Sequence, residues 1–360
     1  MKKKQPLSPF ALVSILLFIL IGIIYTISNV YPSFADLINS TISQDFRKLL
    51  ASSSNAFSFS LFEVIIICLP IIIFIVIYLA IKSFNKKMGG RFIVNICAFV
   101  LLIYSGHLLA LGVGYMTTPI SNKMELLEVQ VNEENLSETL IDLRDELNEL
   151  SAIVSRNDDG VFDPMYSYEE LSGEICSSYN NLAEKYPLTE GFDSVAKEVY
   201  FGNVMSYLGI TGIYTYVTGE ANVNGTYPAY VSIFTAAHEM CHQRGILREN
   251  EANFVAYLIT STSEHEALRY SAALNMYTYF ANALYKTNKE LYYSIASELS
   301  EAVRVDMRAS SAVSDKYGDT ILEKISEKIN DIYLETSGSE GVMSYSRVVE
   351  LVLAYRQTNQ

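Results

Sequence analysis

The chain has 360 residues, half of them apolar, and a net charge of −14. The charge is unevenly divided: residues 1–116 hold nine Lys and Arg against three acids, whereas residues 117–360 hold 17 bases against 37 acids. The strong excess of acids in residues 117–360 argues against a nucleic-acid partner, because binding to phosphates requires Lys and Arg. The division indicates a membrane anchor at 1–116 followed by a part that faces water.

Three apolar runs lie in the expected anchor: Phe10–Val30, Leu61–Ile81 and Phe92–Met116. Each has the roughly twenty residues that a helix needs to cross a bilayer. The first run follows Lys2–Lys4, as the core of a signal peptide would. It is longer than the usual core of about 7–15 residues and no clear cleavage site follows it, so we expect a retained helix.

Basic residues flank these runs unequally. They precede the first run and lie between the second and the third: Lys2–Lys4, Lys82, Lys86, Lys87 and Arg91. The connection 31–60 has no such excess. Because basic segments stay in the cytoplasm, we expect a multi-pass membrane protein with a cytoplasmic amino terminus. Three crossings then place residues 117–360 outside the cytoplasm.

An acidic segment, 117–160, follows the anchor. Its apolar residues recur at alternating spacings of four and three, with acids between: Leu136, Leu140, Leu143, Leu147, Leu150 and Val154. This pattern predicts an amphipathic helix over 121–154 with one narrow apolar seam. The seam could dimerise the protein or bind a partner. We favour packing of the helix on its own domain, because fewer than three heptads make a short coiled coil.

The remaining residues, 161–360, are predicted to form a mainly α domain. A helix is expected at 166–186, and a β-rich stretch punctuated by glycines predicts a strand or hairpin at 207–218. Six further helices are expected at 231–244, 249–262, 264–285, 287–309, 315–335 and, after the Ser337–Ser339 break, 345–356. The fold class is therefore mainly α, with three transmembrane helices and a small hairpin or edge strand.

The expected helix 231–244 contains the sequence His-Glu-Met-Cys-His at 238–242. His238 and His242 are four residues apart, so both rings project from one helical face. That spacing lets two imidazoles bind one Zn²⁺ ion at about 2.0–2.1 Å. Glu239 would take a proton from a zinc-bound water as it attacks a carbonyl, and pass it to the leaving amine. Two histidines buried together without a metal would be costly, which disfavours a purely structural pair.

A catalytic zinc site needs a third protein ligand. Gly245 is placed to end the first helix in a left-handed conformation, and a second helix begins almost at once. Such a tight turn can bring Glu249 or Glu251 back over the first helix. We favour Glu249, with Asn253 binding the free N–H of a ligand histidine. An acid at a helix start can also simply complement the helix dipole.

His-Glu-x-x-His followed by a helix with Glu-x-x-Ala-Asn is similar to the gluzincin peptidases, in which a carboxylate from a second helix completes the zinc site. Glu249 matches the position of that carboxylate ligand. Asn253 matches the position at which gluzincins have Asp or Asn. The wider strings HEMCHQRGILRENEANF at 238–254 and TGEANVN at 218–224 resemble a bacterial membrane family catalogued as domain of unknown function 3810. The resemblance covers most of the chain. It implies an extracytoplasmic zincin-like domain at 161–360, one zinc ion and peptidase activity; only the short separation of His242 and Glu249 departs from gluzincins.

Zincins commonly present an edge strand to which an extended peptide adds. The resemblance therefore implies that 207–218 lies along the cleft, with Tyr214 or Tyr216 available to an oxyanion. The alternative is a core hairpin that contacts no substrate. Glu220 and Asn222 either turn the chain into the site or form a simple turn.

The leading functional hypothesis is a membrane-anchored zinc metallopeptidase that hydrolyses peptides, or the peptide stems of the cell wall, near the outer membrane face. Its expected partners are the lipid bilayer and a peptide or protein substrate. The alternative is a zinc-binding, non-catalytic membrane sensor or assembly factor, with helix 121–154 binding a partner. A transporter is a weaker third hypothesis, because the three apolar runs contain no buried charge pair.

Overall fold

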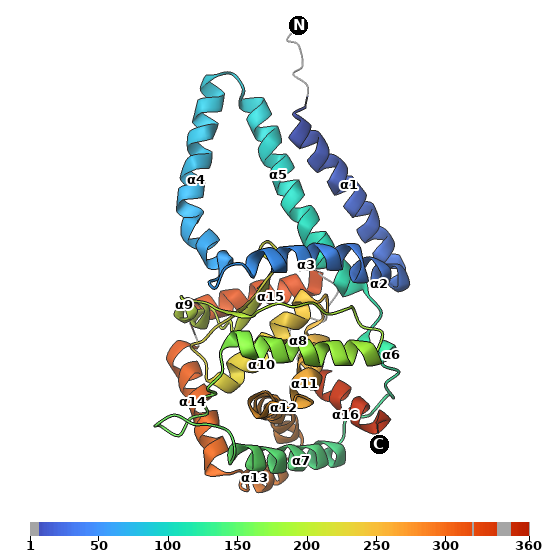
Figure 1. The fold of residues 1–360 in the computed structure, drawn as a ribbon, viewed down its shortest axis with the longest axis vertical. Coiled ribbons are helices and arrows are strands. Elements are labelled where there is room, and N and C mark those ends of the chain that lie inside the picture. Colours follow the sequence, from blue (N-terminus) through green and yellow to red (C-terminus); the bar gives the residue numbers. More distant parts are fainter. Residues whose placement is uncertain (1–6, 319, 337–346, 360) are drawn as a thin grey trace.

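The computed structural model describes residues 7–318, 320–336 and 347–359. Lys2–Lys4 and the expected break at 337–339 lie outside these ranges. Three long apolar helices stand at one end of the molecule, and the other helices gather below them (Figure 1). The prediction of a mainly α chain with three apolar helices and few strands is confirmed.

The three long helices are α1 (Pro9–Val30), α4 (Leu61–Asn85) and α5 (Gly89–Ala110), and α5 continues into the 3₁₀ segment η1 (Gly112–Met116). All three are long and apolar enough to cross a membrane, as predicted. The start of α1 and the α4–α5 turn lie at the end remote from the other helices (Figure 1). This arrangement suits three successive crossings; which side is cytoplasmic stays a prediction from the basic residues.

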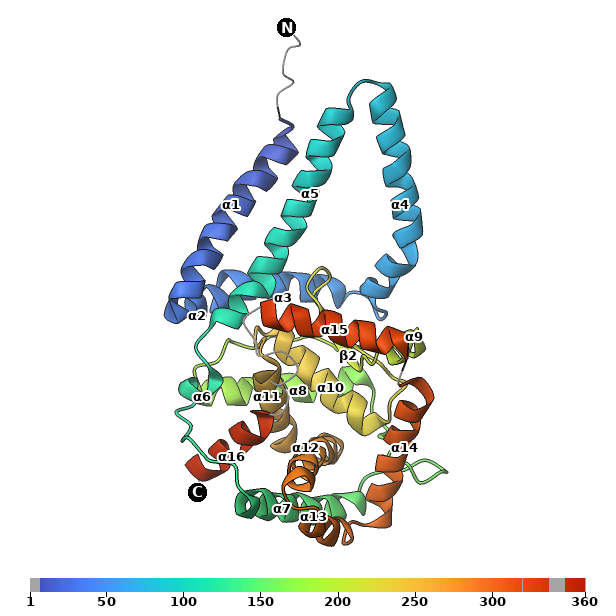
Figure 2. The ribbon, with the colours of Figure 1, turned by 180° about the vertical axis from the view of Figure 1, so that it is seen from behind.

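The connection 31–60, whose secondary structure was not predicted, forms two helices, α2 (Pro32–Ser40) and α3 (Ile42–Ser54). Views from opposite sides show them lying across the ends of the long helices (Figures 1 and 2). Ala35 and Ile38 of α2 are buried in a small apolar cluster with residues of α5 and η1. The two helices thus form a layer, the α2–α3 layer, between the long helices and the rest of the chain.

The helix predicted over 121–154 is interrupted. A short α6 (Ile120–Lys123) is followed by non-helical residues, and α7 (Glu133–Ser151) begins with a capping box at Asn132. All six seam residues, Leu136 to Val154, are buried in the main core together with residues of α12 (Glu266–Thr287). The seam therefore packs on its own domain, the interpretation we favoured. The segment 117–160 shares the core of the residues that follow it.

Most other helices follow the predicted ranges: α8 (Tyr168–Lys185), α10 (Ala229–Gln243), α11 (Glu249–Ser261), α13 (Lys289–Ala296), α14 (Glu301–Tyr317), α15 (Ile321–Thr336) and α16 (Val348–Thr358). The short helix α9 (Gly202–Tyr207) was not predicted. One range was wrong. The single helix expected at 287–309 is α13 followed by α14, because the Ser300 hydroxyl caps a new helix by accepting the Val303 N–H.

A hairpin is present, but it spans 212–223 and so lies five residues later than the predicted range 207–218. Strands β1 (Lys197–Glu198), β2 (Gly212–Thr215) and β3 (Glu220–Val223) form a sheet in the order β1-β3-β2. β2 runs antiparallel to β3 and β1 parallel to it. The first part of the predicted strand is instead the end of α9 and a turn, in which Gly209 has a φ of +69°. Among the described strands, β2 is an edge strand.

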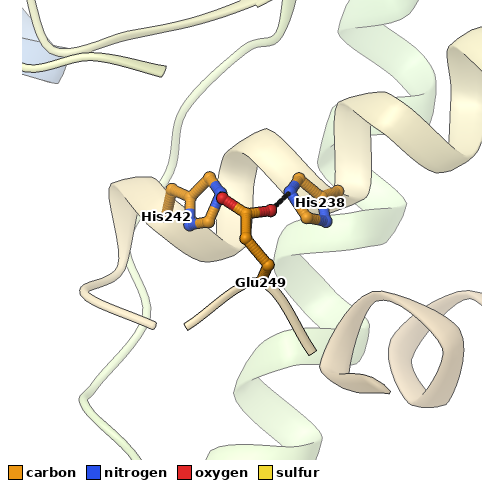
Figure 3. A group of neighbouring side chains, drawn as sticks. All are labelled: His238, His242 and Glu249. Atoms are coloured by element: carbon orange, nitrogen blue, oxygen red, sulfur yellow. Dashed lines mark ion pairs between the residues drawn. The ribbon is translucent and has the colours of Figure 1, made fainter. Parts of the chain in front are cut away.

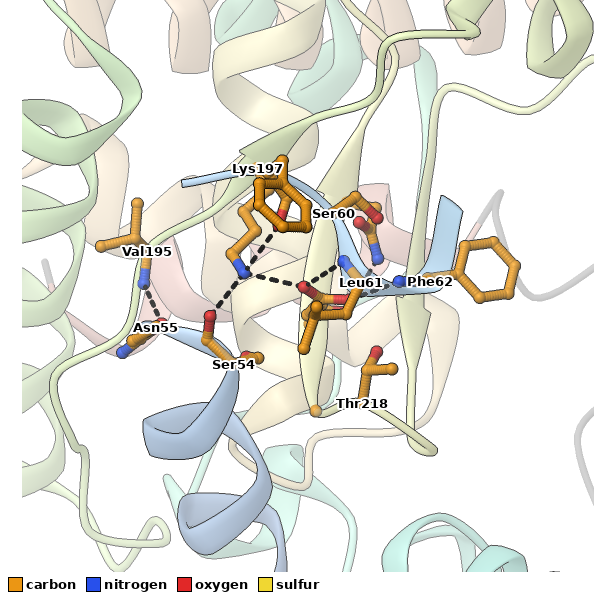
Figure 4. Close-up of polar contacts among 12 residues, drawn as sticks. Ser54, Asn55, Ser60, Leu61, Phe62, Val195, Lys197 and Thr218 are labelled. Carbon is orange, nitrogen blue, oxygen red and sulfur yellow. Dashed lines mark hydrogen bonds and ion pairs between the residues drawn. The ribbon is translucent and has the colours of Figure 1, made fainter. Parts of the chain in front are cut away.

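A buried ion pair joins this sheet to the long helices (Figure 4). The Lys197 ammonium lies 2.7 Å from a carboxylate oxygen of Glu220 and also donates to the Ser54 carbonyl of α3 at 2.7 Å. The Glu220 carboxylate accepts the backbone N–H groups of Leu61 and Phe62, each at 2.9 Å. These are unpaired donors in the first turn of α4, and a carboxylate there also complements the helix dipole. Glu220 therefore anchors a candidate membrane span.

Candidate metal centre

Helix α10 ends in a turn that returns the chain to the helix. Gly245 adopts a φ of +85°, its N–H donates to the His242 carbonyl at 2.9 Å, and the Ile246 N–H donates to the Cys241 carbonyl at 3.1 Å. This is the Schellman arrangement, which glycine adopts without steric cost. Helix α11 then begins at Glu249. The left-handed cap predicted at Gly245 is present, and it explains how so short a connection brings Glu249 back.

Three of the predicted ligands converge (Figure 3). Glu249 lies between the two imidazoles, with 3.2 Å from its Oε2 to His238 Nε2 and 3.6 Å from its Oε1 to His242 Nε2. Possible ligand atoms of the three side chains all lie within 4.8 Å of one another. A tetrahedral ion with bonds of about 2.0–2.1 Å separates its ligands by about 3.3 Å. The spacing and the two-nitrogen, one-oxygen donor set therefore fit Zn²⁺.

The turn after α10 also orients one ligand. His242 Nδ1 lies 2.7 Å from the Ile246 carbonyl oxygen. An Nδ1–H donated to that carbonyl leaves the Nε2 lone pair free to face Glu249 and a metal ion. The predicted partner, Asn253, is buried, but its amide nitrogen has no hydrogen-bond partner among the described residues, and neither has Nδ1 of His238. For His242, a backbone carbonyl therefore takes the role that we expected of Asn253.

The charge balance of the cluster favours a cation. Burial alone would lower the pKa of His242, but the Glu249 carboxylate outweighs it and raises the pKa to about 9. Burial likewise opposes ionisation of Glu249, yet the two imidazoles hold its pKa well below its usual range. A carboxylate that attracts a proton to a buried imidazole attracts a divalent cation to the same position more strongly.

Glu239 lies between the three candidate ligands and the edge strand β2. It is buried, and burial raises the pKa of its carboxyl group. Its carboxylate accepts the backbone N–H of Tyr214 in β2. A Cβ placed on Gly212 would lie 2.8 Å from Glu239 Oε1. β2, at the edge of the described sheet, therefore packs against the helix of the motif. That β2 lies along a substrate cleft stays a prediction.

The two candidates for the third ligand are separated by the structure. Glu251 accepts the Ile120 backbone N–H at 2.9 Å and forms an ion pair with Arg248 at 3.0 Å. Arg248 in turn donates to the carbonyl of Tyr115 in η1. Glu251 therefore holds α11 against the end of α5, and Glu249 is the acid that faces the histidines.

The predicted oxyanion tyrosines lie elsewhere. Tyr214 is buried in an apolar cluster with residues of α5 and η1, and its hydroxyl has no hydrogen-bond partner among the described residues. Burial raises its pKa to about 12. Tyr216 packs its ring edge against His107 near the end of α5, with 5.4 Å between the ring centroids. Both rings thus join β2 to the base of α5.

One tyrosine near the cluster was missed. Burial and, to a smaller extent, the nearby negative charge of Glu249 together raise the pKa of Tyr279, on α12, to about 12. Unlike Tyr214, it is only half-buried. Nothing in the local pattern of α12 distinguishes this tyrosine from its neighbours Tyr277 and Tyr285, because only packing of α12 beside α11 brings it near Glu249.

The α2–α3 layer supports the turn that carries the site. The Asn39 side chain donates to the Gly245 carbonyl at 3.1 Å. The guanidinium of Arg47 is fully buried and donates to the Ala110 and Asn39 carbonyls at 3.0 and 2.9 Å. A Cβ on Gly245 would meet both Arg47 and Asn39. The segment between the two ligand helices is thus fixed by residues that precede α4.

Access to the cluster is narrow. The side chains of His238, His242 and Glu249 are 10–12% exposed. Two surface hollows of about 570 and 380 Å³ are lined by other residues, near α7 and near the start of α8. The three side chains are therefore largely shielded from water.

A family whose model is described as "Protein of unknown function (DUF3810)" matches residues 37–353. Neither the curated proteins nor the solved structures include a match to this chain. The matched region begins in α2 and includes α4, α5, the α2–α3 layer and all three converging side chains. The chain belongs to this DUF3810 family.

Proposed function

We propose that this protein is a membrane-anchored, zinc-dependent peptidase of the gluzincin type. The observation that carries the proposal is the convergence of His238, His242 and Glu249, with Glu239 beside them on the same helix and an edge strand along that helix. The family description names no activity, so the proposal rests on this geometry and on the similarity of the motif to gluzincins.

His238, His242 and Glu249 would hold the zinc ion, with His242 oriented by the Ile246 carbonyl. When bound, zinc would lower the pKa of a coordinated water and polarise a carbonyl oxygen. Glu239 would accept the proton of the attacking water and deliver it to the leaving nitrogen. Its raised pKa suits both transfers, because a group that first accepts and then donates a proton works best with a pKa near the ambient pH.

The edge of β2 would bind the substrate backbone. A peptide that adds beside β2 as a further strand passes over Glu239 and the three ligands. Gly212 lets β2 lie close to Thr235 and Glu239 of α10, so a peptide beside β2 would lie close to Glu239. We expect peptide substrates in an extended conformation, reached outside the cytoplasm if the basic flanks set the orientation as predicted.

The test combines metal analysis with peptide hydrolysis, using the full chain purified in detergent. We expect one zinc per chain in the wild type and in His265→Ala, a control histidine that packs against Tyr166 instead of the cluster. His238→Ala and Glu249→Ala should lose the metal. Glu239→Gln should keep it while hydrolysis of a peptide library falls by about 10²- to 10⁴-fold. Absence of stoichiometric zinc in the wild type would overturn the proposal.

The low exposure of the ligands favours a second candidate, a non-catalytic sensor or assembly factor in which zinc joins α10 to α11. In that case His238→Ala should lower both the zinc content and the thermal stability. Glu239→Gln should then leave every measured property unchanged, and the library should not be cleaved by any variant.

A further inference from the structure

Helix α15 turns its apolar face outward. Five large apolar side chains of this helix are 51–78% exposed: Ile321, Leu322, Ile325, Ile329 and Ile332. At 3.6 residues per turn, these positions fall within an arc of about 100°. The half-buried residues Glu323, Ser326 and Asp331 lie on the other side. A helix on the surface of a soluble domain shows the reverse arrangement, with its apolar face toward the core.

Contacts tie this helix to the base of a candidate span. The Thr320 hydroxyl, just before α15, donates to the Tyr207 carbonyl at the end of α9 at 3.0 Å. Just before α9, the backbone N–H groups of Tyr200 and Phe201 donate to the Glu63 carboxylate, each at 2.8 Å. Glu63 lies in the first turn of α4. The start of α15 is therefore linked through α9 to the point where α4 leaves the domain.

The neighbouring surface is also apolar. Tyr200 is 86% exposed, and Phe201, Val204 and Tyr207 are exposed beside it. Tyrosine is enriched where proteins meet the membrane–water boundary. In the two opposite views, α15 and α3 lie on different sides of the molecule, and α15 lies just below the level of α3 at the end of the domain that faces the long helices (Figures 1 and 2). The exposed apolar residues of α15 therefore lie near the end of the domain at which the chain would enter the bilayer.

We propose that α15 lies in the membrane interface, with its five exposed apolar side chains in the boundary between lipid headgroups and acyl chains. The partner is lipid because the three long helices place the bilayer on this side of the domain. Four acids and two lysines give α15 a net charge of −2. The attachment therefore depends on apolar area and needs no anionic lipid.

This second attachment would fix how the site meets the membrane. α9 leads within a few residues into β2, the strand beside Glu239. Held by α3 on one side and α15 on the other, the domain keeps β2 close to the lipid surface. If the proposed peptidase function holds, accessible substrates are peptide segments close to the bilayer. The lipid contact itself requires neither zinc nor hydrolysis.

The chain contains no tryptophan, so one introduced residue gives an unambiguous fluorescence signal. We would reconstitute full-length Ile325→Trp and Ile329→Trp in phosphatidylcholine vesicles, with and without brominated acyl chains. Ile72→Trp, in the middle of α4, is the reference for lipid contact, and Tyr293→Trp, exposed on α13, is the control for water. We expect both α15 probes to lose about half or more of their emission to brominated lipid.

The quenching should be the same at low and high salt, and Tyr293→Trp should be quenched only by aqueous acrylamide. Quenching of both α15 probes by acrylamide but not by brominated lipid would show a water-exposed helix and overturn the proposal. Protection from both quenchers would overturn it too, because the face would then be covered by protein, either another segment or a second copy. None of these readouts uses zinc or activity, so this proposal can fail independently of the peptidase.

Discussion

At the scale of single residues, position 212, near the site, has no space for a side chain and therefore requires glycine. A Cβ at this position would collide with the Thr235 side chain and lie 2.8 Å from Glu239 Oε1. Without a side chain, β2 approaches α10 closely enough for the Tyr214 N–H to reach Glu239. The orientation of Glu239, the proposed proton acceptor, therefore depends on the absence of a side chain at Gly212 in β2.

Gly212→Ala should move β2 away from α10 and weaken the bond between Tyr214 and Glu239. We expect destabilisation of about 1–3 kcal/mol, as for other overpacked positions, with zinc content unchanged and peptide hydrolysis reduced. Thermal unfolding, metal analysis and the peptide library measure the three properties. Gly173→Ala, in α8, is the matched control: a Cβ there meets nothing within 4 Å, so it should be neutral or stabilising. Equal hydrolysis by both variants would contradict this role of Gly212.

At the scale of elements, the first turn of α4 depends on a side chain more than 150 residues later in the chain. Glu220 neutralises Lys197 and accepts two N–H groups of that turn (Figure 4). Both partners of the ion pair are almost fully buried. Removing one partner of such a pair leaves a buried charge uncompensated.

Glu220→Ala should therefore destabilise the protein by about 3–5 kcal/mol. Arg308→Ala provides the comparison, because its pair with Glu301 is more than 60% exposed on both sides and should contribute less than about 1 kcal/mol. Unfolding of both variants in the same mild detergent measures the difference. A similar loss of unfolding free energy in the two variants would show that the buried pair contributes no more to stability than the exposed pair.

At the scale of the whole molecule, the site and the anchor form one structure. The turn between the ligand helices is held by Asn39 and Arg47 of the α2–α3 layer, and α11 is held to η1 through Arg248. Residues 117–360 alone would lack all of these partners. Residues 1–116 therefore support the site in addition to attaching the rest of the chain to the membrane.

A fragment of residues 117–360 should bind zinc at least about ten-fold more weakly than the full chain, the effect expected when residues that orient metal ligands are lost. Competition with a chelator measures the affinity. A chain of residues 31–360 in detergent is the matched control, because it lacks α1 but keeps the α2–α3 layer. Full affinity in the fragment would show that α10, α11 and their turn are positioned without the anchor.

Patterns within short stretches of sequence were sufficient for several features. The apolar lengths of α1, α4 and α5 predicted the candidate spans, and the spacing of His238 and His242 placed both rings on one face of α10. Gly245 marked the end of that helix. These features were predictable because they depend on composition or on helical geometry over one or two turns.

Long-range packing settled what such patterns left open. It selected Glu249 over Glu251, because Glu251 meets Ile120 and Arg248, residues whose positions depend on how α5 and α11 pack. Long-range packing also turned Glu220 toward α4 and buried Tyr214 against the C-terminal end of α5 and η1. A helical period gives the direction of a side chain relative to its own helix. Its partner depends on which distant segment occupies that direction, and only the folded chain determines that.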